Sequence, residues 1–240
     1  MDGIERLEWD SEQLSLNVAR LIKPRIPRQE LQIILNHLAK AGVKLVYWAS
    51  DSECSESQYA AESLNGFLAD EKITYLFDLK KLNPNVSLPM DYSISEYEDI
   101  KPSIELIELA YLSGKYSRFQ QDPCFSSKQF QTIYRTWIEN SVNKQIAKKN
   151  FVIKIEGYLA GMITLGEKQG NGDIGLLAIH EQYQGKKLGK ALVTAAQHYF
   201  YSHYQYCQVV TQKINIPACR LYESCDFSIK KVENFYHFWL

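Results

Sequence analysis

The stretch that decides the fold runs from Asp173 to Leu192 and reads DIGLLAIHEQYQGKKLGKAL. It opens with a short apolar run, Ile174 to Ile179, of the size and composition of a buried strand, and then turns into a helix that we expect to begin at Gly185. Unpaired backbone N–H groups and the helix dipole attract negative charge at the start of a helix. The stretch therefore predicts a cradle for a phosphate or pyrophosphate. Its positive side chains are Lys186, Lys187 and Lys190.

The glycine spacing in this stretch excludes two common phosphate sites. Three residues lie between Gly185 and Gly189, whereas a Walker loop has four residues between its glycines. Ala191 follows Lys190, where that loop carries Ser or Thr. The G-x-G-x-x-G pattern of dinucleotide folds is absent. From this motif alone, an anion cradle and an ordinary turn with solvated lysines explain the pattern equally well.

A second motif, NIPACRLYESCDF, runs from Asn215 to Phe227. Asn215 stands where a strand ends and a helix begins, with Pro217 at an early helical position. Tyr222 follows two turns along the same helix face. A positioned phenol can protonate the thiolate that leaves when an amine attacks a thioester. Taken alone, this motif is better explained by a helix cap and a core tyrosine.

Together, and in this order, the two motifs resemble the signatures of the GCN5-related N-acetyltransferase (GNAT) family, Q/R-x-x-G-x-G/A and N-x-x-A-x-x-x-Y-x-x-x-G-F. Two family glycines are replaced, by Lys187 and Asp226; an aspartate tolerates a left-handed helix end. The resemblance implies acetyl-CoA as co-substrate, without a metal. It also implies the GNAT fold, an α/β (α+β) fold with a mixed twisted central sheet flanked by helices.

The resemblance also assigns roles within the expected site. Tyr222 would protonate the departing CoA thiolate, and Asn215 would orient the CoA arm, so both are expected to be catalytic. The pantetheine would pair with the backbone of Leu177 and Ile179, and an N–H near Leu177 or Ala178 would hold the thioester oxygen. The expected cofactor-binding residues are Leu177, Ala178, Ile179, Gln184, Gly185, Lys186, Lys187, Leu188, Gly189, Lys190, Asn215 and Tyr222.

Further segments are similar to the bacterial acetyltransferases of dTDP-fucosamine. They are LEWDSE near the start, SRF at 117–119, WIENSV at 137–142 and YHFWL at 236–240. Those enzymes acetylate the 4-amino group of a dTDP-linked 4-amino-4,6-dideoxy-galactose for a cell-surface polysaccharide, and carry a small N-terminal domain. The resemblance implies a nucleotide-linked amino sugar as the acceptor, acetylated by direct transfer in a ternary complex.

Two further side chains are candidate substrate-binding residues. Arg118, in the loop 117–125, is expected to face an anionic group of the acceptor, and Glu167 is a candidate general base. A solvated loop side chain is the simpler explanation of each. Two alternatives stay open: an acyltransferase for another small amine (an amino acid, a polyamine or a protein N-terminus), and a non-catalytic acyl-CoA-binding module.

Composition narrows the class of protein. The chain has 240 residues, 45% apolar and 23% charged, with a net charge of −1, which gives no electrostatic case for nucleic-acid binding. No apolar run is long enough to insert into a membrane. The five cysteines are scattered without C-x-x-C spacing, so we expect reduced thiols, no metal site and a cytoplasmic protein. The aromatic C-terminal segment is compatible with a homodimer interface and equally with burial inside one chain.

The order of predicted elements suggests two domains. Residues 1–82 read as alternating strands and helices and are expected to form a small N-terminal α/β domain. The segment NPNVSLP, 83–89, has the proline and asparagine content of a linker. Residues 90–240 are expected to form the acetyltransferase domain, with a hairpin turning at Glu156-Gly157.

Overall fold

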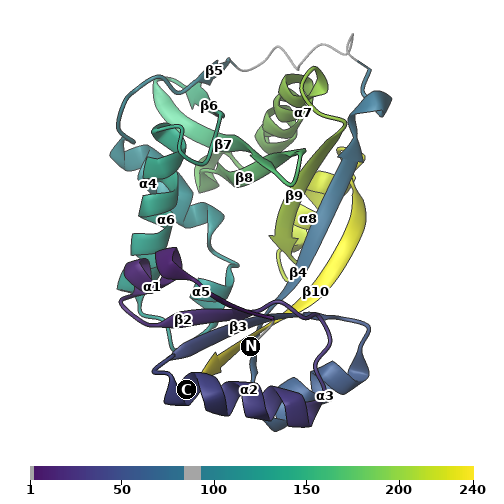
Figure 1. The fold of residues 1–240 in the computed structure, drawn as a ribbon. Coiled ribbons are helices and arrows are strands. Elements are labelled where there is room, and N and C mark those ends of the chain that lie inside the picture. Colours follow the sequence, from purple (N-terminus) through teal and green to yellow (C-terminus); the bar gives the residue numbers. More distant parts are fainter. Residues whose placement is uncertain (1–2, 84–92) are drawn as a thin grey trace.

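A computed structural model describes residues 3–83 and 93–240. The strands of these residues form one ten-stranded mixed sheet, in the order β1-β2-β3-β10-β4-β9-β8-β7-β6-β5 (Figure 1). Their bounds are β1 Ile4–Arg6, β2 Val18–Leu21, β3 Leu45–Asp51, β4 Phe67–Asp78, β5 Ile94–Glu96, β6 Lys149–Ile155, β7 Tyr158–Lys168, β8 Asn171–Ile179, β9 Tyr206–Gln212 and β10 Ser228–Trp239.

Helices cover both faces of this sheet. On the part built from β4 and β6–β9, α7 and α8 pack against one face and α4 and α6 against the other. At the β1–β3 end, α2 and α3 cover one face and α1 and α5 the other (Figure 1). The bounds are α1 Glu8–Leu14, α2 Arg28–Lys40, α3 Ser55–Ser63, α4 Ile104–Ser113, α5 Arg118–Gln121, α6 Ser127–Val142, α7 Leu188–Tyr201 and α8 Ile216–Glu223.

Strands from the two expected domains alternate in the middle of the sheet. β10 pairs with β3 on one side and with β4 on the other, and β4 pairs in turn with β9. The sheet therefore runs across both parts of the chain, and the division into 1–82 and 90–240 stays a prediction. Apart from Asn83, the expected linker 83–89 lies outside the described residues. The aromatic side chains of β10 that pack beside Trp48 are buried within this one chain: Tyr236 and Phe238.

Local sequence explains most elements, with one correction near the N-terminus. The partly alternating apolar and polar residues from Leu14 to Ile22 predict a strand of that length. The strand found there is shorter, because the chain up to Leu14 is helical and Ser15 ends that helix in the left-handed region, with φ 55°. The hairpin at Glu156-Gly157 is confirmed, with φ values of 52° and 86° that suit a tight two-residue turn.

Candidate functional site

The parallel strands β8 and β9 separate along their length. They pair only from Gly172 to Ile174, although β8 continues to Ile179. A bulge starts the separation, because Gly175 and Leu176 together oppose the single residue Thr164 of β7. The Thr164 Oγ1 accepts a hydrogen bond of 2.8 Å from the Leu176 N–H. One edge of β8 is thus free of strand partners beyond Ile174, and two cavities meet there.

The backbone of this free edge offers alternate hydrogen-bonding groups. The N–H of Leu176 points to β7, and the His180 N–H donates to the Ala160 carbonyl on the same strand at 2.9 Å. Since successive residues of a strand alternate, Leu177 and Ile179 direct their N–H and C=O groups toward the gap. The same alternation turns the N–H of Ala178 toward β7, so Leu177 supplies the N–H expected beside the reacting atoms.

The turn after β8 corrects the predicted start of the helix. The helix begins at Leu188 rather than at Gly185, because Lys187 adopts a left-handed conformation with φ 62° that a right-handed helix cannot include. This region favours glycine and costs other residues roughly 1 kcal/mol or more. It explains why the resembled signature has glycine at this position. Asp226, at the other replaced glycine, also has φ 62°, as the sequence led us to expect.

A groove of about 730 Å³ runs along the free edge of β8 and over this turn. Gln184 closes the turn by donating to the Ile179 carbonyl at 3.0 Å, and Lys190 donates to the Ser224 carbonyl at 3.0 Å. Every expected cofactor-binding residue lines the groove except Lys186, whose ammonium lies over the Tyr183 ring, and Tyr222. The sequence did not predict the contribution to this groove of the end of α4 and the residues after it, namely Leu112, Ser113, Lys115 and Tyr116.

A second cavity, the acceptor cavity, of about 400 Å³, adjoins the groove and shares Ser113, Leu177, Asn215 and Ala218 with it. Tyr222 lines this cavity and is otherwise buried, which raises the pKa of its phenol and keeps it protonated. The Asn215 Oδ1 accepts from the Ala218 N–H at 3.3 Å, so Asn215 caps α8 at the boundary between the two cavities. The structure therefore places Asn215 at the boundary between the two cavities and Tyr222 in the lining of the acceptor cavity.

Four residues that line the acceptor cavity carry a buried polar atom without a hydrogen-bond partner within the described chain. These atoms are Tyr47 Oη, Asp70 Oδ1, Ser117 Oγ and Arg118 Nη1. Leaving a buried polar group unpaired costs about 1–3 kcal/mol, so four together in one cavity mark a place where a polar ligand can pair with them.

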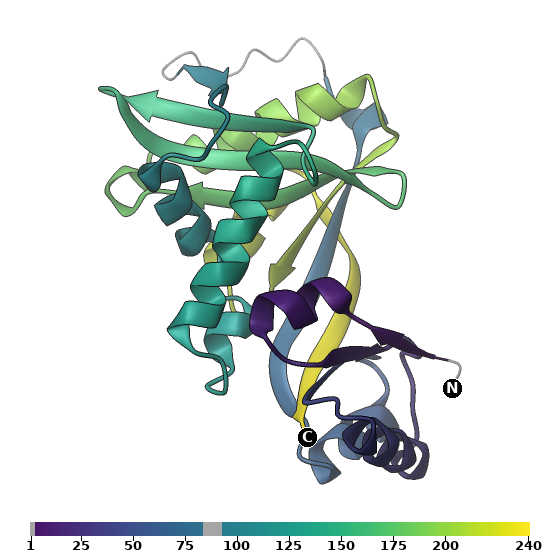
Figure 2. The same cartoon turned by 60° about the vertical axis from the view of Figure 1, so that its left-hand side comes forward.

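Arg118 is held rigidly at this place. Its guanidinium lies over the rings of Tyr47, Phe119 and Phe235, at 4.2, 4.3 and 4.6 Å from the ring centres. It also lies 3.9 Å from Asp10 on α1, which packs beside α6 (Figure 2). The expectation that Arg118 stands in a loop is corrected, because it begins the short helix α5 and lines the acceptor cavity.

A buried hydrogen-bond network ties α5 to the central strand β10. The Asp122 carboxylate accepts from the Trp239 indole at 2.9 Å and lies 2.6 Å from the His237 imidazole. Burial alone would raise the pKa of Asp122, but its hydrogen bonds from His237 and Trp239 lower it overall. Burial lowers the pKa of His237 to about 4, although its bond to Asp122 opposes this shift. The network fixes the helix that carries Arg118.

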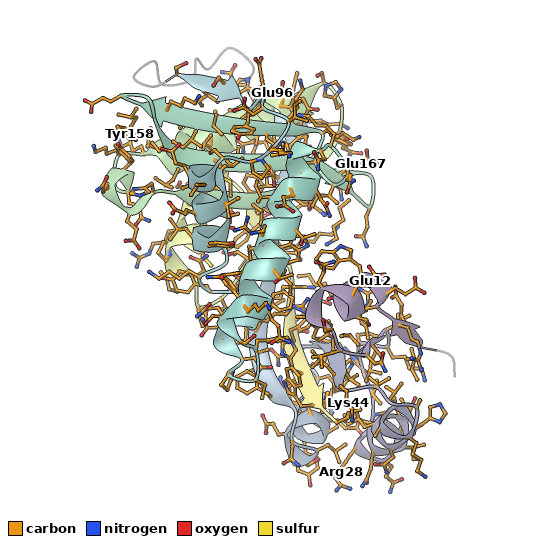
Figure 3. All side chains as sticks on the ribbon, turned by 90° about the vertical axis from the view of Figure 1, so that its left-hand side faces the viewer. Glu12, Arg28, Lys44, Glu96, Tyr158 and Glu167 are labelled. Carbon is orange, nitrogen blue, oxygen red and sulfur yellow. The ribbon has the colours of Figure 1, made fainter. Side chains whose placement is uncertain are left out.

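Glu167 is not brought to this site. It lies toward the end of β7, on the outer part of the sheet (Figure 3), and forms an ion pair with Lys148 and a hydrogen bond with Tyr204. The hydrogen bond from Lys148 lowers the pKa of Glu167, which makes it a weaker base. The carboxylates that line the acceptor cavity are instead Asp10 and Asp70, which lie more than a hundred residues before the second motif.

The acceptor cavity continues into a further space of about 410 Å³ between α6 and strands β7 and β8. The two share the large side chains of Trp137 and Lys168. Nothing in the sequence pointed to this extension.

Within the described residues, no group of His, Cys, Asp and Glu side chains is arranged to hold a metal ion. In the same part of the chain, every helix is too short or too polar to cross a membrane.

Comparison with known proteins agrees with this geometry. Residues 115–227 match the model of the acetyltransferase (GNAT) family. A curated relative is the spore coat polysaccharide biosynthesis protein SpsD of Bacillus subtilis (strain 168), 27% identical over 135 residues. The match covers 56% of this chain and spans just under half, 46%, of that relative's length.

Solved structures confirm the expected fold class. A GCN5-related N-acetyltransferase from Sphaerobacter thermophilus superposes with a TM-score of 0.64 at 12% identity, covering 98% of this chain and 76% of the other. A tandem GNAT protein from the clavulanic acid biosynthesis pathway superposes with a TM-score of 0.58 at 16% identity, covering 92% and 75%. At these identities the likeness concerns the fold alone.

Proposed function

Because the chain belongs to the GNAT acetyltransferases through residues 115–227, and is thus an acyltransferase, we propose a specific acceptor for it. It transfers the acetyl group of acetyl-CoA to the primary amine of a nucleotide-linked amino-deoxy sugar, by direct transfer in a ternary complex. The GNAT family uses acetyl-CoA and acts on amines. The nature of the amine is the new part of the proposal.

The groove is the proposed acetyl-CoA site. The pantetheine arm lies along the free edge of β8 and pairs with Leu177 and Ile179, whose backbone groups face the gap. The pyrophosphate rests on the turn from Gly185 to Lys190, where N–H groups and positive side chains favour an anion. This places the thioester at the junction of the two cavities, beside Tyr222.

The observation that carries the proposed acceptor is the set of unpartnered atoms in the acceptor cavity. Arg118 Nη1 can only donate, Asp70 Oδ1 accepts when ionised, and Tyr47 Oη can do both. An amino sugar carries an amine that can donate to a carboxylate, and hydroxyl and ring oxygens that can accept from a guanidinium and a phenol. A polyamine supplies no group that pairs with the arginine.

The extension of the acceptor cavity supports a nucleotide on the same acceptor. A sugar alone does not fill both spaces, and the shared wall offers an ammonium for phosphate groups and an indole for stacking: Lys168 and Trp137. The relative SpsD is named for spore coat polysaccharide biosynthesis, a process consistent with sugar modification. A cytoplasmic location would follow from such a substrate and stays a prediction.

In the proposed reaction, the neutral amine attacks the thioester carbonyl while both substrates are held together, which lowers the entropic barrier. The Leu177 N–H stabilises the oxygen on which charge builds up. Tyr222, kept protonated by burial, donates its proton to the departing sulfur. Asn215 fixes the start of α8 and thereby the position of Tyr222.

A panel of amines with acetyl-CoA, followed by thiol release, tests this proposal. The panel contains nucleotide-linked amino sugars, the same sugars without nucleotide, amino acids and polyamines. We expect the highest kcat/KM for a nucleotide-linked amino sugar and a clear loss when the nucleotide is removed. Preference for an amino acid or polyamine would replace the proposed acceptor, and binding of acetyl-CoA without transfer to any amine would favour a non-catalytic module.

A further inference from the structure

We infer that Asp70 is the general base that takes the proton from the attacking amine. The inference rests on the proposed function, because it concerns the same amine acceptor. It assigns a catalytic role to a residue of β4, outside residues 115–227 that match the family. The geometry of that strand is the first argument for it.

Strand β4 lies between β9 and β10 and delivers alternate side chains to the acceptor cavity. Asp70 and Lys72 line the cavity, whereas Ile73 on the opposite face packs into the core under α7 and α8. Asp70 pairs in register with Phe235 of β10, one of the rings that hold Arg118. Its position is therefore set by the pairing of β4 with β10 rather than by a flexible loop.

The Asp70 carboxylate is available for a ligand. Its Oδ1 is buried and has no hydrogen-bond partner in the described chain. Asp10, the other carboxylate of this cavity, already lies 3.9 Å from Arg118. His237 does not line the cavity, and its Nδ1 is engaged with Asp122. Asp70 is thus the base with a free oxygen in the cavity that Tyr222 also lines.

The charges around Asp70 suit proton transfer near neutral pH. Burial raises its pKa to about 7, although Arg118, Lys72 and a hydrogen bond from Gln212 lower it. A base with a pKa near the working pH is ionised often enough to accept a proton and still holds that proton well. The titratable groups that face the cavity from the surrounding elements are Asp10, Arg20, Tyr47, Lys72, Arg118, Tyr134, Lys168 and Tyr222, with Glu233 paired to Lys72.

The proton balance of the step is complete. The amine nitrogen forms a bond to the acetyl carbon and gives one proton to the Asp70 carboxylate. The carbon–sulfur bond breaks, and the thiolate takes the proton of Tyr222. A return of the proton from Asp70 through the acceptor cavity to the Tyr222 phenolate restores both residues. The products are the N-acetyl compound and free CoA, without any oxidant or metal.

The test is the pH dependence of acetyl transfer by the full chain and its Asp70→Asn variant, with the best amine of the panel. We expect D70N to lower kcat about 100-fold, since general bases contribute 10²- to 10⁴-fold to the rate. The pH–rate profile of D70N should also lack the fall in rate on the acid side of pH 7. Asp70→Glu should restore part of the rate. The ionisation of the substrate amine affects the pH–rate profile of every variant equally. It is measured separately by titration of the free amine.

Glu71→Gln is the matched control on the same strand, because the Glu71 carboxylate pairs with Lys213 at 2.7 Å and does not line the cavity. It should keep the rate and the acid limb of the pH–rate profile, which moves only slightly because the Glu71 charge is the smallest of the causes that shift the Asp70 pKa. The melting temperature of D70N at pH 8 should equal or exceed that of the wild type, since the variant removes a poorly solvated charge. A D70N variant that retains the rate and the acid limb would overturn the inference.

A measurement without substrate separates this inference from the proposed function. The ¹³C resonance of the Asp70 carboxyl, assigned by its loss in D70N, reports its protonation directly. Titration near pH 7 in the free protein supports a base role, even if no amino sugar proves to be the acceptor. Titration at the ordinary aspartate value of 3.8 overturns it, even if the amino-sugar activity is present.

Discussion

The groove and the acceptor cavity share a boundary but are built in different ways. The groove is lined almost entirely by residues 177–190 and 215–224, with a short contribution from the end of α4 and the residues after it. The acceptor cavity draws residues from α1, β2, β3, β4, α5, α6, β7, β9 and β10 as well as from β8 and α8. The groove is therefore local in sequence, whereas the acceptor cavity depends on strands from most of the sheet.

If the junction between the two is where chemistry occurs, Tyr222→Phe should have the largest effect. Removing the phenol proton is expected to lower kcat about 100-fold or more, with little change in the KM for acetyl-CoA. Steady-state kinetics at saturating substrates measures this. Tyr75→Phe is the matched control, because the Tyr75 ring lies 5.9 Å from the Tyr222 ring but its hydroxyl bonds Glu223. Equal rates for Y222F and Y75F would remove Tyr222 from the reaction.

The acceptor side is tested separately by Arg118→Met. Losing a charged hydrogen-bond donor should raise the KM for the amine about 10- to 100-fold, equivalent to about 1.5–3 kcal/mol, and leave acetyl-CoA binding unchanged. Arg135→Met, on the exposed side of α6, is the control and should behave as wild type. If R118M weakened the binding of acetyl-CoA as strongly as the binding of the amine, the two cavities would not be separate subsites.

The hydrogen-bond network that joins α5 to β10 predicts that the free energy of unfolding depends on pH in the acid range. Asp122→Asn should lower the free energy of unfolding by about 2 kcal/mol, measured by urea denaturation, whereas the exposed Asp99→Asn should change it little. In the wild type, His237 is neutral when folded but binds a proton below about pH 6.5 when unfolded, so its contribution to stability falls as the pH drops from 6.5 toward 4.

Asp122 acts in the same direction as His237, because its lowered pKa contributes stability that is lost on acidification. Asp70 acts in the opposite direction, since its raised pKa costs stability as the pH rises from 3.8 to about 7. The pH series is therefore best measured in the D70N background. Stability that stayed constant between pH 6.5 and 4 in that background would contradict the assignment of His237 as a neutral buried group.

The smallest effect is expected at Lys187. Lys187→Gly should relieve a left-handed conformation and raise stability by about 1 kcal/mol, while the lost charge weakens acetyl-CoA binding about 2- to 5-fold at low salt. Lys144→Gly is the matched control, because Lys144 has the same φ of 62° but does not line the groove. Calorimetric titration at two salt concentrations measures the difference. Wild-type affinity that did not depend on salt would show that these lysines do not contribute charge.

This contrast also explains what the sequence could reveal. The turn around Gly185 and the pair Asn215 and Tyr222 lie in continuous motifs, so their joint resemblance to the family signatures singled them out as candidates. Asp70 stands in an ordinary strand pattern, FLADEKITYLFD, where nothing distinguishes it from Glu71 until the partner strands define which face is the cavity. The candidate base Glu167 is near the groove in sequence, at the end of the strand before it, whereas the acceptor cavity is built by contacts between residues distant in sequence.

The place of β10 in the sheet has a consequence for synthesis of the protein. This strand follows β1–β9 in the chain but lies between β3 and β4, both made more than a hundred residues earlier. Until it emerges from the ribosome, β3 and β4 each expose an unpaired edge and the aromatic core around Trp48 is incomplete. Such long-range pairing forms slowly. The nascent chain would therefore expose aggregation-prone strand edges for most of its translation. A chaperone that shields these edges should raise the yield of active enzyme.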